Sequence, residues 1–353
     1  MRSIEHTTAL VTGATDGLGR SVAHDLAGRG ATVLVHGRSA TRGERIVDEL
    51  KRATGNGRVR LYLADLANLS QVETLADDVA RDHAELHVLV NNAGIGAGLP
   101  DGRERQLSVD GYELRFAVNY LAGYLLTERL LPLLRQSAPA RVGNVASLGQ
   151  QAIDFADVML TRDYDGWRAY QQSKLAQVIY TVDLSERVPA GEVAVNSLHP
   201  GTFMPTKIVT SELDHTVDTL ETGTRNVVRL AVDPIPDGVN GAFFDRDTEA
   251  KADPQAYDAT AQQRGDPKRL LGRRIPGQPD HGAARQVPDR RTPVAHPGGR
   301  PVTRRRRSAR PGDLRLRVRR RRRGVERGLP GRRPPPRRLR LRVIGARPRS
   351  TTP

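Results

Sequence analysis

The sequence predicts an α/β fold in which one parallel, doubly wound sheet carries helices on both faces. Seven short apolar runs alternate with helical patterns between residues 8 and 245, as in repeated strand–helix units. A glycine-rich turn joins the first run to the first helical pattern. The composition changes abruptly after Gln263. We therefore expect a single domain over residues 1–263, followed by a tail over residues 264–353.

Charge separates these two parts of the chain. Residues 1–263 contain 26 basic and 35 acidic residues, a net charge of −9, whereas residues 264–353 contain 30 and 5, a net charge of +25. The overall charge of +16 therefore belongs to the tail. Cysteine is absent, which excludes disulfides and thiolate metal sites, and we expect no metal. No apolar run has the length of a signal peptide or a membrane span, so we expect a cytoplasmic protein without a membrane partner.

The first expected strand, residues 8–12, runs directly into the glycine-rich turn. The glycines allow a tight turn, close approach of a ligand to the backbone, and close packing of the helix expected over residues 18–28. Unpaired N–H groups and a partial positive charge at the start of that helix favour a pyrophosphate. An ordinary strand-to-helix turn is the alternative. The candidate cofactor contacts in this turn are Gly13, Thr15, Asp16, Gly17, Leu18 and Gly19.

The second expected strand, residues 32–37, ends at Arg38. In dinucleotide-binding folds this strand end lies beside the adenine ribose, where an acid suits a free 2′-hydroxyl and an arginine suits a 2′-phosphate. Here the strand end carries no acid. We therefore predict that NADP(H) is preferred over NAD(H). Arg42, a few residues further on, is more simply explained as a surface residue of the next helix.

The middle of the chain places polar and small residues after three further strands. The strands are expected over residues 58–63, 86–90 and 140–146, with helical patterns over residues 69–82 and 110–135. Asp65 and Leu66 follow the first of these strands, Asn91-Asn92-Ala93-Gly94 the second, and Ser147 the third. Ligands of open α/β sheets bind beyond the carboxyl ends of the strands, so we expect the Ser147 hydroxyl to point into the site.

Two helical patterns carry unusual polar residues. Asn119 lies inside the 110–135 pattern, where asparagine has poor helix propensity and therefore needs another reason to be present. The pattern over residues 167–185 contains Tyr170 and Lys174, which share a helix face four residues apart. An ammonium group beside a phenol favours the ionised phenol, so this pair is a candidate proton donor. Trp167 lies one turn earlier, and packing is its expected role.

The last strands are expected over residues 193–198 and 241–245. His199, Pro200, Gly201 and Thr202 form the turn after the first of them, and we expect His199 to fix this turn rather than to catalyse. Residues 213–232 suggest a lid followed by a helix.

Together these motifs resemble the short-chain dehydrogenase/reductase family over residues 5–260. They are the Thr-Gly-x-x-x-Gly-x-Gly turn that ends at Gly19, the Asn91-Asn92-Ala93-Gly94 run, and the Tyr-x-x-x-Lys pair of Tyr170 and Lys174. The gap between Ser147 and Tyr170 is longer than usual, and this insertion resembles the retinol-dehydrogenase-like branch. The resemblance implies a Rossmann-type fold, a small-molecule carbonyl or alcohol substrate, and often a homo-oligomer.

The resemblance also implies roles for individual residues. Asp65 would contact the adenine ring, although a helix N-terminal cap explains it equally well. Asn92, Ala93 and Gly94 would leave room for the cofactor. Pro200 and Gly201 would contact the nicotinamide, and Thr202 and Thr206 compete for a further contact with the nicotinamide or the phosphates. The candidate catalytic residues are Asn119, Ser147, Tyr170 and Lys174.

The expected reaction is hydride transfer between a nicotinamide and a carbonyl or secondary alcohol. In the reducing direction Tyr170 donates a proton to the substrate oxygen, and Ser147 hydrogen-bonds the same oxygen. Lys174 lowers the pKa of Tyr170 and holds the nicotinamide ribose. Asn119 keeps a relay water in place. A dinucleotide-binding protein without catalysis is the first alternative.

The tail, residues 264–353, contains 29 arginines, one lysine, 14 prolines and 11 glycines, with almost no periodic apolar pattern. Such a segment buries too little apolar surface to offset chain entropy, so we predict disorder. It could bind nucleic acid through its arginines, be an extension without function, or result from reading a GC-rich gene out of frame. The tail contains no aromatic residue for base stacking, so we favour the last two explanations.

Overall fold

Buried strands form the centre of the molecule, and their order is that of a doubly wound sheet. The computed structural model describes residues 3–98, 102, 104–234 and 238–270. Within them the strands are β1 (Thr8–Val11), β2 (Thr32–Gly37), β3 (Val59–Leu63), β4 (Val88–Asn91), β5 (Ala140–Val145), β6 (Val193–His199), β7 (Phe243–Asp245) and β8 (Thr248–Ala250). Their order across the sheet is β3-β2-β1-β4-β5-β6-β7-β8. Strands β1 to β7 pair in parallel, which confirms the seven predicted strands.

Strand β8 is the one element of the sheet that the sequence did not predict. It pairs antiparallel with β7 across a short hairpin, and none of its three residues is buried. A strand this short and exposed lacks the apolar run by which buried strands are recognised.

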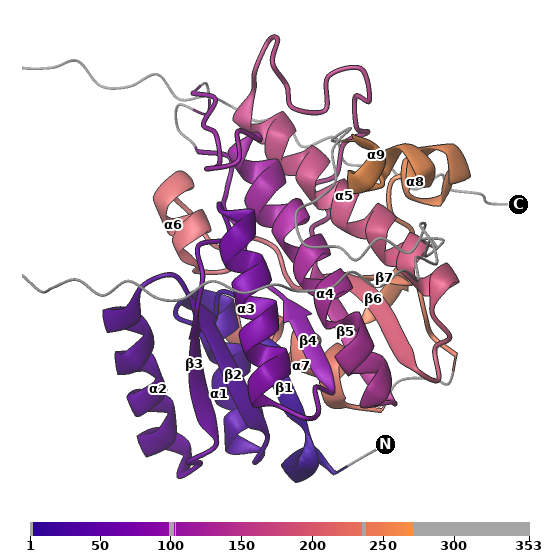
Figure 1. Ribbon diagram of the computed structural model, residues 1–353. Coiled ribbons are helices and arrows are strands. Elements are labelled where there is room, and N and C mark those ends of the chain that lie inside the picture. The colour runs from indigo at the N-terminus through magenta and orange to yellow at the C-terminus, as the bar shows by residue number, and fades with distance from the viewer. Residues whose placement is uncertain (1–2, 99–101, 103, 235–237, 271–353) are drawn as a thin grey trace, which may run out of the picture. The chain divides into compact units, whose positions relative to one another are not determined.

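Helices cover both faces of the sheet (Figure 1). The described helices are α1 (Gly17–Gly28), α2 (Ala40–Thr54), α3 (Leu69–Asp82), α4 (Ala122–Gln136), α5 (Gly166–Arg187), α6 (Lys207–Glu212), α7 (Leu220–Val232), α8 (Ala259–Gly265) and α9 (Pro267–Leu270), with short helical turns η1 (Ile4–His6), η2 (Phe116–Leu121) and η3 (Pro254–Tyr257). None of the helices that the structure describes is long and apolar enough to cross a membrane.

Two apolar cores result, one on each face. Successive strand residues point to opposite faces, so Leu10 and Leu34 join α3, α4 and α5 in one core, while Val11 and Val33 join α1, α2 and α7 in the other. Both faces of the sheet are therefore covered, as expected for a parallel sheet.

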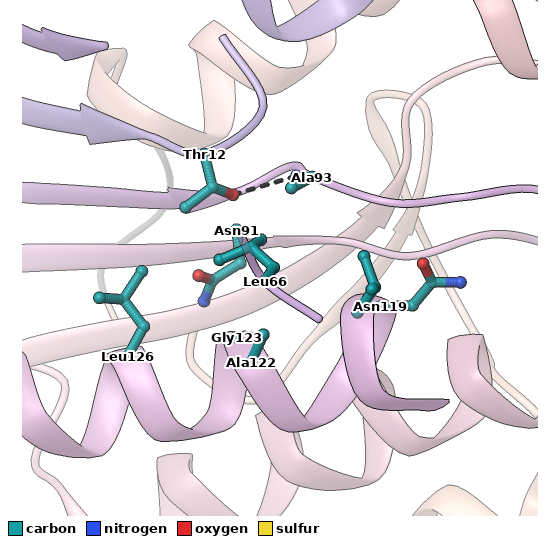
Figure 2. Close-up of a pocket in the computed structure, with 9 residues that line it drawn as sticks. Thr12, Leu66, Asn91, Ala93, Asn119, Ala122, Gly123 and Leu126 are labelled. Carbon is teal, nitrogen blue, oxygen red and sulfur yellow. Dashed lines mark hydrogen bonds between the residues drawn. The ribbon is translucent and has the colours of Figure 1, made fainter. Parts of the chain in front are cut away.

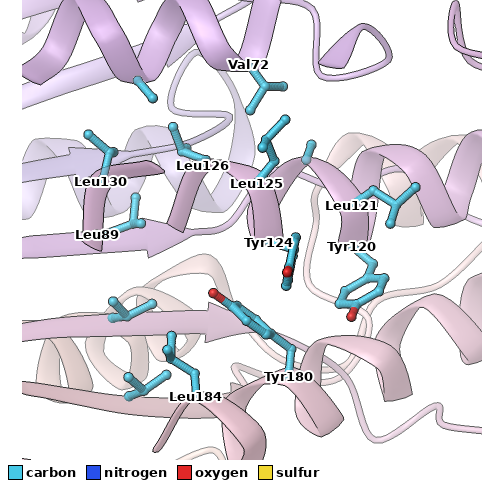
Figure 3. Close-up of a cluster of buried hydrophobic side chains, with 14 of the residues drawn as sticks. Val72, Leu89, Tyr120, Leu121, Tyr124, Leu125, Leu126, Leu130, Tyr180 and Leu184 are labelled. Carbon is cyan, nitrogen blue, oxygen red and sulfur yellow. The ribbon is translucent and has the colours of Figure 1, made fainter. Parts of the chain in front are cut away.

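The core between α4 and α5 contains an aromatic cluster (Figure 3). Tyr124 and Tyr180 meet edge to face with ring centroids 4.9 Å apart, and Tyr120 lies beside both. The Tyr120 hydroxyl donates to the Gly265 carbonyl at 2.9 Å, which anchors α8 on this surface. Helices α8 and α9 thus continue the folded domain past Gln263 as far as Leu270. The rest of the predicted tail, residues 271–353, lies outside the described residues, and the division into domain and tail stays a prediction.

The long helix expected over residues 110–135 begins later and is not uniform. The Glu113 carboxylate accepts from the Phe116 N–H at 2.7 Å, and Glu113 itself pairs in an isolated β-bridge with Leu107. The chain then makes one π-helical turn, η2, before α4 begins at Ala122. A π-helical turn widens the helix by one residue, and such turns are frequent at functional sites. Asn119 lies within it.

Candidate active site

The glycine-rich turn lies against the end of β4. The Thr12 hydroxyl accepts from the Ala93 N–H at 3.0 Å (Figure 2). It also accepts from the Asn92 N–H at 2.9 Å, and the Asn92 amide donates back to the Thr12 carbonyl at 2.8 Å. A Cβ on Gly13 would come within 2.9 Å of the Ala93 Cα, and one on Gly19 would collide with the Asn92 side chain. The turn therefore requires glycine at both positions.

The rest of the turn leads into the first turn of α1. Gly17 has a φ of +48°, and Asp16 caps α1 by accepting from the Gly17 N–H at 2.8 Å. Thr15 packs against Gly37 at the end of β2, and Leu18 is buried. The first N–H groups of a helix have no intrahelical acceptor, so this cradle can take an anion.

His36 supports the turn from below, and the sequence did not single it out. Its Nδ1 accepts from the Gly13 N–H at 3.1 Å, and its Nε2 lies 3.1 Å from the Ala64 carbonyl. Burial lowers the pKa of His36 to about 4, against the smaller raising effect of its bond to Ala64. The ring is therefore neutral at physiological pH and can both accept and donate. The sequence did contain one signal for this role, because His36 is a polar residue inside a mostly apolar strand.

Beyond β2 and β3 lie the residues expected to contact the adenosine. Arg38 is exposed at the end of β2. Leu66 is buried and lines a small pocket together with Ala93 and Asn119 (Figure 2). Asp65 accepts from the Ala67 N–H at 3.0 Å in a local turn, whereas Asn68 caps α3. The alternative explanation of Asp65 as a helix cap was therefore wrong.

Asn119 is 2% exposed and holds the segment that follows β4. Its Oδ1 accepts from the Ile95 N–H at 2.8 Å, and its Nδ2 lies 3.2 Å from the Ile95 carbonyl and 2.9 Å from the Ser173 hydroxyl on α5. A Cβ on Gly94 would lie 3.3 Å from the Asn119 Oδ1 and 3.6 Å from the Lys174 Nζ. Asn119 thus joins η2, the Gly94 segment and the helix of the Tyr170 and Lys174 pair.

Ser147, Tyr170 and Lys174 meet beyond the end of β5. The Ser147 Oγ accepts from the Gly149 N–H at 3.0 Å, and a Cβ on Gly149 would lie 3.4 Å from that Oγ and 3.9 Å from the Tyr170 ring, so Ser147 and Tyr170 lie side by side. The Lys174 Nζ lies 5.8 Å from the centre of the Tyr170 ring. Trp167 stacks on Tyr170 with ring centroids 5.5 Å apart, and it is 39% exposed.

The pKa of Tyr170 does not shift in the expected direction. Burial raises it, the hydrogen bond with Ser147 acts against burial, and the charge of Glu212 adds to it. Burial also lowers the pKa of Lys174 to about 7, and its Nζ donates to the Val145 carbonyl at 2.9 Å and to Gln177 at 3.0 Å. A lysine that is half neutral near pH 7 stabilises a phenolate weakly.

The turn after β6 is fixed by an ionic cluster. The Thr202 N–H donates to Asp218 at 2.6 Å, and Arg246 donates to Asp218 at 2.7 Å and to the Thr202 hydroxyl at 3.2 Å. His199 Nε2 lies 3.0 Å from the same hydroxyl, which agrees with its expected role in fixing the turn. Burial lowers the pKa of His199 to about 4. Arg246 comes from the unpredicted β7–β8 hairpin, so the sequence offered no signal for it.

The two competing threonines occupy different places. The hydroxyl of Thr202 is engaged in the cluster with Arg246, and a Cβ on Gly201 would lie 3.3 Å from Asp218. Thr206 instead packs on the glycine-rich turn, since its Cγ2 would lie 3.4 Å from a Cβ on Gly17. The Pro200 carbonyl accepts from Asn226 on α7 at 2.8 Å. The geometry brings Thr206 nearer to the phosphate cradle.

Buried charges that the sequence did not predict lie behind the site. Glu113 and Arg115 are 1% and 5% exposed. Tyr164, from the insertion before α5, donates to Glu113 at 2.9 Å and accepts from Arg115 at 2.7 Å. Nothing in the local pattern distinguishes these three residues from surface residues, because their partners are remote in sequence.

The parallel sheet is open, a glycine cradle follows β1, and a tyrosine–lysine pair lies beyond β5. These features define a dinucleotide-binding protein of the dehydrogenase type. A family model described as short chain dehydrogenase matches residues 7–216. The chain belongs to the short-chain dehydrogenase family, in its retinol-dehydrogenase-like branch.

Individual relatives agree with this assignment. Retinol dehydrogenase 11 of Mus musculus is 38% identical over 196 residues, which are 55% of this chain and 60% of that protein. The chain thus spans about three fifths of the length of the curated retinol dehydrogenases that it matches first. The salutaridine reductase structure of Papaver somniferum has a TM-score of 0.55 at 25% identity, covering 68% of this chain and all of that one. A putative NAD(P)-dependent gluconate 5-dehydrogenase of Beutenbergia cavernae, with NADP bound at low occupancy, has a TM-score of 0.53 at 30% identity, covering 68% and 95%.

Proposed function

We propose that this chain is an oxidoreductase that transfers a hydride between a nicotinamide dinucleotide and a small carbonyl or secondary alcohol, with Tyr170 as the general acid and base. The observation that carries the proposal is the meeting of Ser147, Tyr170 and Lys174 beyond β5, beside Asn119. Because all four residues of the family's catalytic set are present and adjacent, this proposal is favoured over a binding protein without catalysis.

The residues of the cradle fit a dinucleotide. Gly13 and Gly19 let the turn pack closely on the end of β4, where a Cβ would collide, and the N–H groups at the start of α1 are free to bind an anion. When bound, the dinucleotide supplies or accepts the hydride. The residues that would hold it are Gly13, Thr15, Asp16, Gly17, Leu18, Gly19, Arg38, Asp65, Leu66, Asn92, Ala93, Gly94, Tyr170, Lys174, Pro200, Gly201 and either Thr202 or Thr206.

The side chains around the substrate oxygen divide the proton chemistry. Tyr170 is protonated at neutral pH because burial raises its pKa, so it can donate a proton to a carbonyl oxygen. Ser147 hydrogen-bonds the same oxygen and stabilises the negative charge that develops on it. Lys174, whose pKa is about 7, can return a proton toward Tyr170, and Asn119 would hold the relay water.

We further propose that NADP(H) is preferred over NAD(H). Arg38 stands exposed at the end of β2, and no acidic residue occupies that strand end. A guanidinium group can bind a 2′-phosphate with two parallel hydrogen bonds.

A phenylalanine variant tests the assignment of Tyr170. Tyr170→Phe keeps the ring but removes the proton, so turnover of a panel of aldehydes and ketones should be abolished while calorimetric binding of NADPH is preserved. Tyr62→Phe on β3 removes a hydroxyl remote from the site and should leave both unchanged. A Tyr170→Phe protein that retained most of its turnover would rule out the proposed role.

A further inference from the structure

The segment of residues 95–98, which follows the Asn91-Asn92-Ala93-Gly94 run, has its backbone bonded almost entirely to side chains. We call it the 95–98 loop. From one side, Asn119 binds both polar groups of Ile95. From the same side Arg115, one helical turn before Asn119, donates to the carbonyls of Gly96 and Ala97 at 2.9 Å each. The loop therefore has little freedom next to the catalytic asparagine.

The other side of the loop is held by Glu212, the last residue of α6. Its Oε2 accepts from the Ala97 N–H at 3.0 Å and its Oε1 from the Gly98 N–H at 2.9 Å. A Cβ on Gly96 would collide with the Glu212 carboxylate, so the contact also depends on glycine in the loop. A carboxylate that accepts from two backbone N–H groups makes two charge-assisted hydrogen bonds.

Helix α6 belongs to an excursion of the chain, residues 203–217, which we call the α6 segment. The base of the segment is closed by backbone bonds from Val217 to Phe203 and from Asp218 to Thr202, at 3.1 and 2.9 Å. Arg246 and Asp218 reinforce this base. Figure 1 shows α6 as a short helix set apart from the helices that cover the sheet.

Within the described residues, the hydrogen bonds that tie α6 itself to the rest of the chain are those of Glu212, whereas Met204 and Thr206 pack near the base of the segment. No residue of α6 is buried, so the helix has no apolar core of its own. A short helix without packing is marginal in water. The two bonds from Glu212 to the 95–98 loop therefore decide where the far end of the α6 segment lies.

We propose that Glu212 is a positioning residue for the hydride-transfer site: its carboxylate fastens the α6 segment to the 95–98 loop, which Asn119 joins to the helix of Tyr170 and Lys174. The fastening stands by itself, and its effect on turnover rests on the proposed function.

Limited proteolysis tests the fastening without any turnover. Lys207 is exposed on α6, so trypsin cleavage after it reports how often the segment opens. In the full chain, Glu212→Ala should speed this cleavage about tenfold. The cleavage is measured by mass spectrometry of the peptide that ends at Lys207. Asp214→Ala is the matched control, because Asp214 lies in the same segment and bonds to His215 rather than to the loop. Equal cleavage of Glu212→Ala and the unmodified chain would overturn the fastening.

Steady-state kinetics test the effect on turnover. Because the loop that Glu212 holds is joined through Asn119 to the helix of Tyr170 and Lys174, Glu212→Ala should lower kcat several-fold with little change in the KM for NADPH, and Asp214→Ala should change neither. An unchanged kcat in Glu212→Ala would overturn this effect. A chain that reduces no carbonyl at all would contradict the proposed function instead, and the cleavage assay would still decide the fastening.

Discussion

The two sides of the site are built in different ways. On the cofactor side, the cradle is formed by the contiguous residues 12–19 and is closed against the adjacent end of β4 by bonds of the Thr12 hydroxyl and the Asn92 amide to backbone groups. On the substrate side, the 95–98 loop is held mainly by side chains, and its bonds to Glu212 join residues 114 and 115 positions apart. The cofactor side depends on glycines and short uncharged side chains, and the substrate side on charged side chains from distant parts of the chain.

This difference has an energetic consequence. A glycine cradle cannot adapt to a new side chain, because the neighbouring atoms are backbone or buried amides. A charge-assisted hydrogen bond can be removed without a steric collision. The free energy lost depends on which buried polar or charged groups are then unpaired. Substitutions on the cofactor side should therefore act mainly on binding, and those on the substrate side on stability and turnover.

The largest effect is expected from a methyl group placed in the cradle. A Cβ on Gly19 would lie 2.5 Å from the Gly13 carbonyl oxygen, so Gly19→Ala must displace the turn. Calorimetric binding of NADPH should weaken by roughly 1,000-fold. Gly57→Ala is the control, since no atom of the described residues lies within 4 Å of its Cβ position, and it should bind normally. Unchanged binding by Gly19→Ala would mean that the cradle does not hold the cofactor.

An intermediate effect is expected from a substitution of Arg115, the buried arginine that donates to the 95–98 loop. Arg115→Met leaves the carboxylate of Glu113 without its cation and two loop carbonyls without their donor. The free energy of unfolding in urea should fall by about 3 kcal/mol, while NADPH binding changes far less.

Two comparisons sharpen that result. Arg81→Met removes an exposed arginine whose partners are Asp78 and Asp82, and it should leave the urea midpoint unchanged. The double variant Glu113→Gln with Arg115→Met should recover part of the lost stability, because it leaves no buried charge unpaired. A stability loss in Arg115→Met no larger than in Arg81→Met would contradict this account of the substrate side.

The smallest effect is expected at the exposed edge of the cofactor side. Arg38→Ala should weaken NADPH binding by about tenfold and leave NADH binding unchanged, because the arginine would contact only the 2′-phosphate. Arg42→Ala, one helical turn away on α2, should change neither affinity. Equal losses for both dinucleotides in Arg38→Ala would remove the basis for an NADP(H) preference.

The sequence predicted most of the fold and a candidate catalytic set whose residues the fold brings together, and it did so from local patterns. Apolar runs marked β1 to β7, and the motifs around Gly13, Asn92 and Tyr170 marked the site. The π-helical turn at Asn119 was not predicted, because its widening depends on Glu113 and on packing against α5. The fastening residue Glu212 was missed for a similar reason: an acid at the end of a short polar helix looks like any surface residue.

The sequence by itself therefore determined the order of strands and helices, the glycine cradle and the identity of the tyrosine and its partners. These features follow from backbone geometry and side-chain periodicity within a few residues. Only the tertiary structure decided which charges are buried, that Thr206 rather than Thr202 lies against the cradle, and that the pKa of Tyr170 is raised rather than lowered. Burial and long-range electrostatics depend on neighbours brought together by folding, and no local pattern contains them.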